Sequence, residues 1–254
     1  MKGSSAGAIT LADGNGNDFY SPIDFTAQKI SYTRTFTLAA NGSSGWNSLM
    51  VPFNVSTITC DGIDGNVDWF HSATDTGKNF WLRAFTADGS NTVTFDYATS
   101  IDANTPYIIA VPDNRWGDNL RMTGRKVTFS ATNAQVSATK DAYVSGDNYK
   151  FCGTTAKKDL TNVYKLNATG SQFVKQASTS AGAFRVWFSP VSISSLTHSS
   201  LSILSPETTG LLPISVDVRE TKTDSWYSLD GRRLSGKPTA KGIYINNGKK
   251  QIIR

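Results

Sequence analysis

The sequence contains very little glutamate, histidine or cysteine. Only two of its acidic residues are Glu, and the other eighteen are Asp. Glu favours helices whereas Asp favours turns and caps, so a chain this poor in Glu and rich in Thr, Ser, Asn and Gly is expected to build almost no helix. We therefore predict an all-β protein, and its 254 residues allow one large domain or two smaller ones.

The chain also lacks any apolar run of the roughly eighteen residues that a membrane helix needs, so no membrane span is expected. Residues 1–10 lack the apolar core of a signal peptide, and we interpret the polar start as a chain whose export signal has been removed. The formal net charge is +5, but the basic residues are scattered, with no cluster larger than adjacent pairs such as 232–233 and 249–250. Nucleic-acid binding needs a concentrated basic footprint and is not expected.

The sequence lacks the common motifs of enzyme active sites. The sequence has no Gly-x-Ser-x-Gly elbow, no phosphate-binding loop and no dinucleotide fingerprint. A hydrolase stays open as an alternative, either through a triad that uses His71 or through a pair of Asp carboxylates of the glycosidase type. Half of the Asp residues, however, sit beside Gly or Asn, where turn chemistry alone would place them. We therefore expect no enzymatic activity, and a structural role for His71.

Short strand-like runs separated by turn signals fill most of the chain. Residues 32–36 alternate as Tyr-Thr-Arg-Thr-Phe, which predicts a half-buried strand. The apolar run at 49–53 predicts a strand buried on both faces, and the apolar run at 107–112 predicts a central core strand. Such runs recur roughly every eight to twelve residues, which is typical of a sandwich or barrel. The other predicted strands are 55–60, 67–70, 80–85, 92–97, 126–130, 134–138, 149–152, 163–166, 173–175 and 183–188.

These patterns divide the chain into four parts. Residues 1–28 are an N-terminal segment, and residues 29–204 are predicted to form an antiparallel β-sandwich. Residues 205–225 form a Pro- and Thr-bearing connector. Residues 226–254 are predicted to form a tail of two β-hairpins, because Asp-Gly at 230–231 and Asn-Gly at 247–248 are strong two-residue turn signals.

A calcium site is one interpretation of the N-terminal segment. Asp13, Asn15 and Asn17 have the one-three-five spacing of an EF-hand loop, and Asp24 falls at the twelfth position, where a carboxylate closes such a site. The sixth position holds Asp18 instead of the required glycine, so an ordinary turn is the alternative. Apart from this calcium site, no cofactor is expected.

The two cysteines, Cys60 and Cys152, have no metal-ligand spacing. In an exported protein they could form a disulfide, worth up to roughly 4 kcal/mol in the loop-entropy model. Two buried thiols are the equal alternative.

Aromatic residues provide the candidates for ligand binding, because sugar rings stack on exposed Trp and Tyr. Trp46, Trp187 and Trp226 fall within predicted strands and are expected in the core. The candidate glycan platform therefore consists of the tryptophans in or beside loops and of nearby polar residues: Trp69, Trp81, Trp116, Asn114, Arg115 and Asp118.

Several stretches resemble a known group of proteins. Residues 32–36, 46–53, 104–109 and 183–188 resemble a module of secreted and surface proteins of gut and oral Bacteroidetes, which often follows leucine-rich or other repeats. Residues 226–250 resemble the short C-terminal tail of many exported proteins of these bacteria, and more loosely the longer sorting domains of type IX secretion. The resemblance implies export, an extracellular or outer-surface location and an adhesion-like role, and it brings no established reaction with it.

The leading hypothesis is thus a non-catalytic, exported cell-surface module that acts in adhesion or as a scaffold. Its expected partner is a glycan or a surface or matrix protein. A carbohydrate-binding module is the first alternative, and a glycoside hydrolase-like enzyme is the second.

Overall fold

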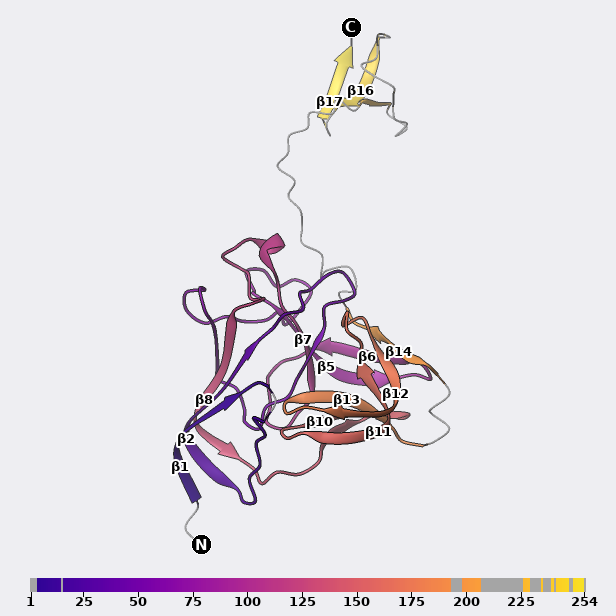
Figure 1. Cartoon of the computed structure of the whole chain (residues 1–254). Coiled ribbons are helices and arrows are strands. Elements are labelled where there is room, and N and C mark those ends of the chain that lie inside the picture. The colour runs from indigo at the N-terminus through magenta and orange to yellow at the C-terminus, as the bar shows by residue number, and fades with distance from the viewer. Residues whose placement is uncertain are drawn as a thin grey trace. The chain divides into compact units, whose positions relative to one another are not determined.

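The computed structural model describes residues 4–14, 16–192, 198–206, 226–228, 234, 239, 241–246 and 249–253. The chain separates into two compact units, Met1–Ile214 and Ser215–Arg254. Among the described residues, the only helical element is one 3-10 turn, η1 (Asn114–Trp116), and all other regular elements are strands (Figure 1). The prediction of an all-β protein is confirmed. No helix in this part of the chain is both long and apolar enough to cross a membrane.

The first unit begins with a four-stranded sheet in the order β1-β2-β8-β4. Strand β1 runs parallel to β2, and the other neighbours are antiparallel. Because β1 and the start of β2 belong to this sheet, part of the N-terminal segment 1–28 joins the structure predicted to start at residue 29. The strands are β1 (Ser4–Ala12), β2 (Phe25–Thr35), β4 (Thr57–Cys60) and β8 (Lys126–Val136).

A second sheet of ten strands completes the unit, in the order β3-β7-β5-β6-β14-β12-β11-β13-β10-β9. Strand β14 pairs with β6 in parallel, so both sheets are mixed, whereas a purely antiparallel sandwich was predicted. The strands are β3 (Asn47–Leu49), β5 (Trp81–Asp88), β6 (Thr92–Tyr97), β7 (Tyr107–Ala110), β9 (Ala142–Ser145), β10 (Tyr149–Thr154), β11 (Lys158–Leu166), β12 (Gln172–Ala181), β13 (Arg185–Pro190) and β14 (Ser200–Leu204).

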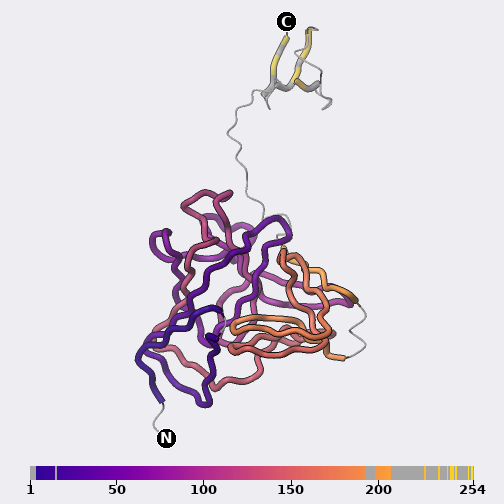
Figure 2. Tube along the Cα trace, in the orientation of Figure 1, coloured from indigo at the N-terminus to yellow at the C-terminus, as the bar shows by residue number. Residues whose placement is uncertain are grey.

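Strand β7 separates two hydrophobic cores. Tyr107 and Ile109 face the first core, which also contains side chains of the four-stranded sheet. Ile108 and Ala110 face the second core, to which β10 also contributes Phe151. Because strands near both ends of the ten-stranded sheet share this second core, the sheet curls around it (Figure 2). The prediction that residues 107–112 lie in the core is confirmed, but the strand ends at Ala110, and it is central only in lying between the two cores, because β7 is second from one end of its sheet.

Several predicted strands differ from the structure. Of the predicted strand 49–53 only Leu49 lies in a strand, β3. Residues 126–130 and 134–136 lie in one strand, β8, which pairs with β2 on both sides of Asn133 although Asn133 has a positive φ of 50°. Residues 67–70 form only an isolated bridge, between Trp69 and Phe80. The predicted strand 183–188 begins only at Arg185, because Phe184 has a positive φ of 62°; its ring lies in the first core, whereas Val186 and Phe188 lie in the second.

Two glycines let a pair of loops touch beside β3. The Gly45 N–H donates to the Thr169 carbonyl at 2.9 Å, and the Trp46 N–H donates to the Gly170 carbonyl at 3.1 Å. A Cβ on Gly170 would lie 2.2 Å from the Trp46 carbonyl oxygen, so only glycine fits at this approach. The contact fixes the edge of a surface hollow described below.

The second unit contains a three-stranded sheet in the order β15-β16-β17. Its strands are β15 (Trp226–Ser228), β16 (Gly242–Asn246) and β17 (Lys249–Ile253). The antiparallel pair β16 and β17 matches the second predicted hairpin. In place of the first, β15 pairs with β16, and only the bond from the Leu234 N–H to the Trp226 carbonyl matches the predicted partner segment. The connector 205–225 lies outside the described residues except for its first two positions.

Candidate functional site

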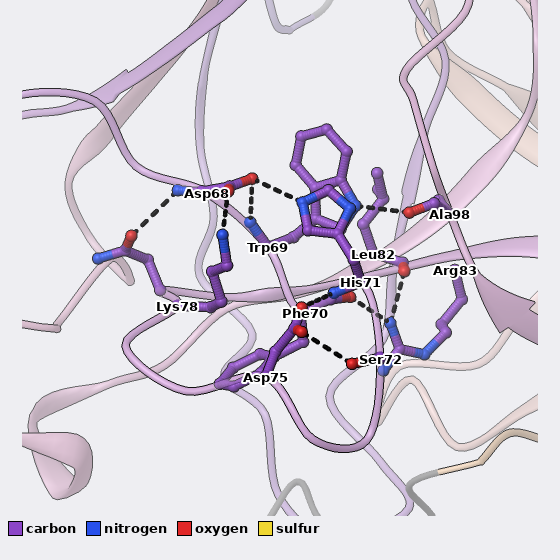
Figure 3. A network of polar contacts seen from close by, with 11 residues as sticks. Asp68, Trp69, Phe70, His71, Ser72, Asp75, Lys78, Leu82, Arg83 and Ala98 are labelled. Atoms are coloured by element: carbon purple, nitrogen blue, oxygen red, sulfur yellow. Dashed lines mark hydrogen bonds and ion pairs between the residues drawn. The ribbon is translucent and has the colours of Figure 1, made fainter.

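The three tryptophans of the predicted glycan platform do not form an exposed surface. Trp69 is partly buried against the first core, and its indole N–H donates to the Ala98 carbonyl at 2.7 Å (Figure 3). Trp81 belongs to the second core and is 4% exposed. Trp116 lies over Trp81, with ring centroids 4.8 Å apart, and Phe70 stacks on Trp81 at 5.4 Å. Because other rings cover Trp81, the three tryptophans do not present the predicted stacking surface. They pack against the cores and the neighbouring loops instead.

The polar residues predicted beside that platform behave differently from one another. Arg115 binds the scaffold, because its Nε donates to both Asp113 oxygens and its Nη2 donates to the Ala40 carbonyl at 3.0 Å. Asn114 and Asp118 are exposed. Arg115 therefore anchors the η1 turn, and a ligand would have to compete with these bonds.

A polar network surrounds the loop before β5 (Figure 3). The Asp68 carboxylate accepts bonds from the Trp69 backbone N–H at 2.8 Å and from the Lys78 ammonium, and it lies 3.1 Å from the His71 Nε2. Partial burial raises the pKa of Asp68, but these bonds, above all the one from Lys78, outweigh it and hold the pKa below its ordinary value. The carboxylate is thus kept ionised and fixes the loop.

The same network does not assemble the triad considered for His71. A nucleophilic hydroxyl must lie against the imidazole that removes its proton. The Ser72 hydroxyl instead donates to Asp75 Oδ1 at 2.7 Å, and the His71 backbone N–H donates to Asp75 Oδ2 at 2.6 Å. These bonds close a turn around Asp75. The loop can orient an imidazole, but it presents no activated hydroxyl.

The residues of the predicted calcium loop are held by other partners. The Asp13 carboxylate receives two bonds from Arg185, at 2.7 and 2.9 Å, and lies 3.5 Å from the Arg34 Nε. Asp24 accepts from the Ala138 N–H at 2.7 Å, and Asn17 donates to the Asp13 carbonyl at 2.8 Å. Asn15 lies outside the described residues. Because two guanidinium groups already compensate Asp13, the geometry favours an ion-pair cluster over a calcium loop.

The structure contains no bond between Cys60 and Cys152. Both thiols are free, with Cys60 in β4 of the four-stranded sheet and Cys152 in β10 of the ten-stranded sheet. Burial raises the pKa of both thiols, which disfavours the reactive thiolate. The disulfide alternative is therefore replaced by two separate thiols.

Titration of thiols in denaturant without reductant should give two per chain, because neither cysteine has a partner. In the native protein the reaction should be slow, since Cys60 is buried, Cys152 is partly buried, and both thiols have raised pKa values. Peptide mapping under non-reducing conditions supplies the control. A cross-linked peptide that contains Cys60 and Cys152 would contradict the assignment.

A hollow that no sequence motif predicted lies on the outer face of the ten-stranded sheet. The hollow has a volume of about 310 Å³ and lies over β9, β10, β11 and β13. Tyr143 on the edge strand β9 is 50% exposed, whereas Trp187 in β13 is 3% exposed and belongs to a small apolar cluster. Cys152 pairs with Tyr143 on one side and with Trp187 on the other, so the three side chains form one cross-strand row. We call this the Tyr143 hollow.

Charged groups surround the Tyr143 hollow. The Lys150 ammonium lies 4.7 Å from the centroid of the Tyr143 ring. Lys158 and Asp141 form an ion pair at 2.6 Å, and both are largely exposed. The aromatic and β-branched pair at 143–144, just before the turn residues Gly146 and Asp147, is the sequence signal that would have indicated this strand.

No protein-family model matches the chain, nor does any curated protein or solved structure. The structure thus defines an all-β protein of two mixed sheets, with an aromatic and charged hollow on one sheet face. The resemblance to Bacteroidetes surface modules, and the location that it implies, stay predictions.

Proposed function

We propose that this chain is a non-catalytic recognition module of an exported surface protein, that it acts in adhesion, and that it binds carbohydrate in the Tyr143 hollow. The observation that supports this proposal is the half-exposed Tyr143 ring beside an apolar floor and a charged rim. The apolar face of a sugar ring packs well on an aromatic ring, and its hydroxyl groups need polar partners at the edge.

The position of Tyr143 suits such a contact. Strand β9 is the last strand of its sheet, so no strand of the described part of the chain covers its free edge. The Lys150 ammonium occupies one face of the ring, and the 50% exposure of Tyr143 leaves area for a ligand. Tyrosine offers a large, rigid contact surface with little side-chain entropy to lose. Asp141 and Lys158 supply an acceptor and donors for hydroxyl groups within the same hollow.

A non-catalytic role is supported by the state of the groups that a hydrolase would use. The Ser72 hydroxyl donates to Asp75 and not to His71, and the Asp13 carboxylate is paired with Arg185. Both groups thus stabilise the scaffold. The adhesion role and the surface location rest on the family resemblance of residues 32–36, 46–53, 104–109, 183–188 and 226–250.

Replacement of Tyr143 with alanine should weaken glycan binding about tenfold or more, because the stacking surface is removed. Binding of the wild-type chain to a broad glycan array would identify a ligand, and titration calorimetry would compare the variants. The control is Tyr20→Ala, since Tyr20 is 70% exposed and lies outside the hollow. Equal binding by the Tyr143→Ala and Tyr20→Ala proteins, or silence of the wild type on the array, would contradict the proposal.

A further inference from the structure

A second hollow on the ten-stranded sheet has positively charged side chains, but no negatively charged ones, among its lining residues. Its volume is about 380 Å³, and it lies between the β2 end, the β3 strand and the strands β11 and β13. The charged residues that line it are Arg34, Lys165 and Arg185, and no acidic side chain is among its lining residues. We call it the cationic hollow.

Burial of these positive charges raises the free energy of the folded chain. Alternation along β2 puts Arg34 on the same buried face as Tyr32 and Phe36, and Arg34 is only 9% exposed. Among the described residues, Asp13 is the one carboxylate paired with Arg34 and Arg185, so the three cations and this anion leave a net charge of two positive units. The buried Arg34 Nη1 donates to the Ser48 carbonyl, but the Nε forms no hydrogen bond and has only the Asp13 carboxylate, at 3.5 Å, as a compensating charge. Burying uncompensated charge is unfavourable, so an anion at the hollow would lower the free energy of the folded chain.

Lys165 completes the hollow from β11. Its ammonium donates to the Ser180 carbonyl at 2.6 Å and to the Thr179 hydroxyl at 3.3 Å. Burial and the charge of Arg185 together lower the pKa of Lys165. Lys165 is therefore held by neutral oxygens close to a like charge, in a place where an anion would be a better partner.

The two hollows share one face of the sheet. On β11, Val163 lines the Tyr143 hollow and Lys165 lines the cationic hollow, and residues two apart on a strand share a face at about 7 Å. On β13, likewise, Trp187 lines the Tyr143 hollow, and Arg185, two residues before it, lines the cationic hollow. One extended ligand along these strands would therefore reach from one hollow to the other.

We infer that the cationic hollow binds the carboxylate or sulfate group of an acidic saccharide whose neighbouring sugar unit lies in the Tyr143 hollow, an inference that rests on the function proposed above. Guanidinium groups suit such anions because their forked donors match the oxygen pairs. An acidic peptide would satisfy the cationic hollow equally well, but the aromatic ring on the same face favours the saccharide.

Four probes of equal length would test the inference by calorimetry: a uronic acid oligosaccharide, the same oligosaccharide with its carboxylates reduced to hydroxymethyl groups, a sulfated oligosaccharide and an oligoglutamate peptide. The wild type should bind the uronate or the sulfated probe about tenfold more tightly than the neutral one at low salt. This preference should largely disappear between about 0.05 and about 0.5 M salt, because the Debye length shrinks severalfold. The salt series needs no variant, so it applies even where a substitution impairs folding.

The variant Lys165→Gln should lose about fivefold in affinity for the acidic saccharide and nothing for the neutral one, because it removes charge while keeping a donor. Lys29→Gln removes the same charge from an exposed position on β2 and should change neither. If acidic and neutral saccharides bind equally, the inference is wrong while the proposed function stands. Binding of no saccharide overturns both, and tighter binding of oligoglutamate assigns the hollow to acidic peptides instead.

Discussion

Phe188→Ala is expected to lower the free energy of unfolding by about 3–5 kcal/mol, because it leaves a cavity at the centre of the second core. Phe188 is 0% exposed. Its ring centroid lies 4.6 Å from that of Phe151, 4.8 Å from that of Phe173 and 5.1 Å from that of Phe85. These rings come from different strands of the ten-stranded sheet and cannot all move inward at once. Urea denaturation, monitored by tryptophan fluorescence, would measure the change in the free energy of unfolding.

Two further variants serve as controls for the stability of the Phe188→Ala protein. Phe188→Leu fills most of the same volume and should cost less than about 1.5 kcal/mol. Val191→Ala changes a side chain that is 51% exposed just beyond β13 and should stay within about 0.5 kcal/mol of the wild type. A Phe188→Ala cost no larger than that of Val191→Ala would show that the aromatic cluster is not the centre of the core.

Composition and local pattern were sufficient to predict the class of the fold. The scarcity of Glu indicated strands, and the continuous apolar run at 107–112 predicted a core strand, which the structure places between the two cores. The mixed pairing was not predictable in this way, because β14 and β6 lie about a hundred residues apart and periodicity says nothing of which strands become neighbours. Phe184 shows the limit of pattern-based prediction at a single residue. Because its φ is positive, its ring lies in the first core, whereas strand alternation alone would place it with Val186 and Phe188 in the second.

The candidate site was less predictable than the fold. Proximity of a tryptophan to a loop suggested exposure for Trp81, but Phe70 and Trp116 cover it in three dimensions. The cationic hollow depends on contacts between β2, β11 and β13, which no local motif encodes. Only the alternation along residues 32–36 indicated that Arg34 would lie on the buried side of its strand, and its ion-pair partner could not be inferred from that pattern.

Asp13→Asn is expected to lower the free energy of unfolding by about 3 kcal/mol at neutral pH. The amide has the same shape as the carboxylate but leaves Arg34 and Arg185 without their shared negative charge. Losing one partner of a buried ion pair typically costs about 3–5 kcal/mol, and the lower end applies because the Asp13 and Arg185 side chains are 21% and 29% exposed. Thermal and urea denaturation of the purified variant would measure the change.

The matched control is Asp141→Asn. Asp141 and Lys158 approach to 2.6 Å, closer than any contact of Asp13, but their side chains are 80% and 46% exposed. A surface pair of this kind contributes about 0–1 kcal/mol. Equal effects of the two substitutions would mean that burial does not set the strength of the Asp13 cluster.

The dependence on pH separates the charge of Asp13 from its packing. Partial burial raises the pKa of Asp13, but the bonds from Arg185 and the charges of Arg34 and Arg185 outweigh it and hold the pKa below its ordinary value of 3.8. A carboxyl whose pKa is lowered by folding stabilises the fold fully above its unfolded pKa, and it loses that contribution as the pH falls through its folded pKa. The difference between wild type and Asp13→Asn should therefore be constant from about pH 7 to about pH 5 and shrink below about pH 4. A difference that does not shrink in acid would assign the cost of the substitution to packing and hydrogen-bond geometry, because only the ionised carboxylate compensates the two arginines.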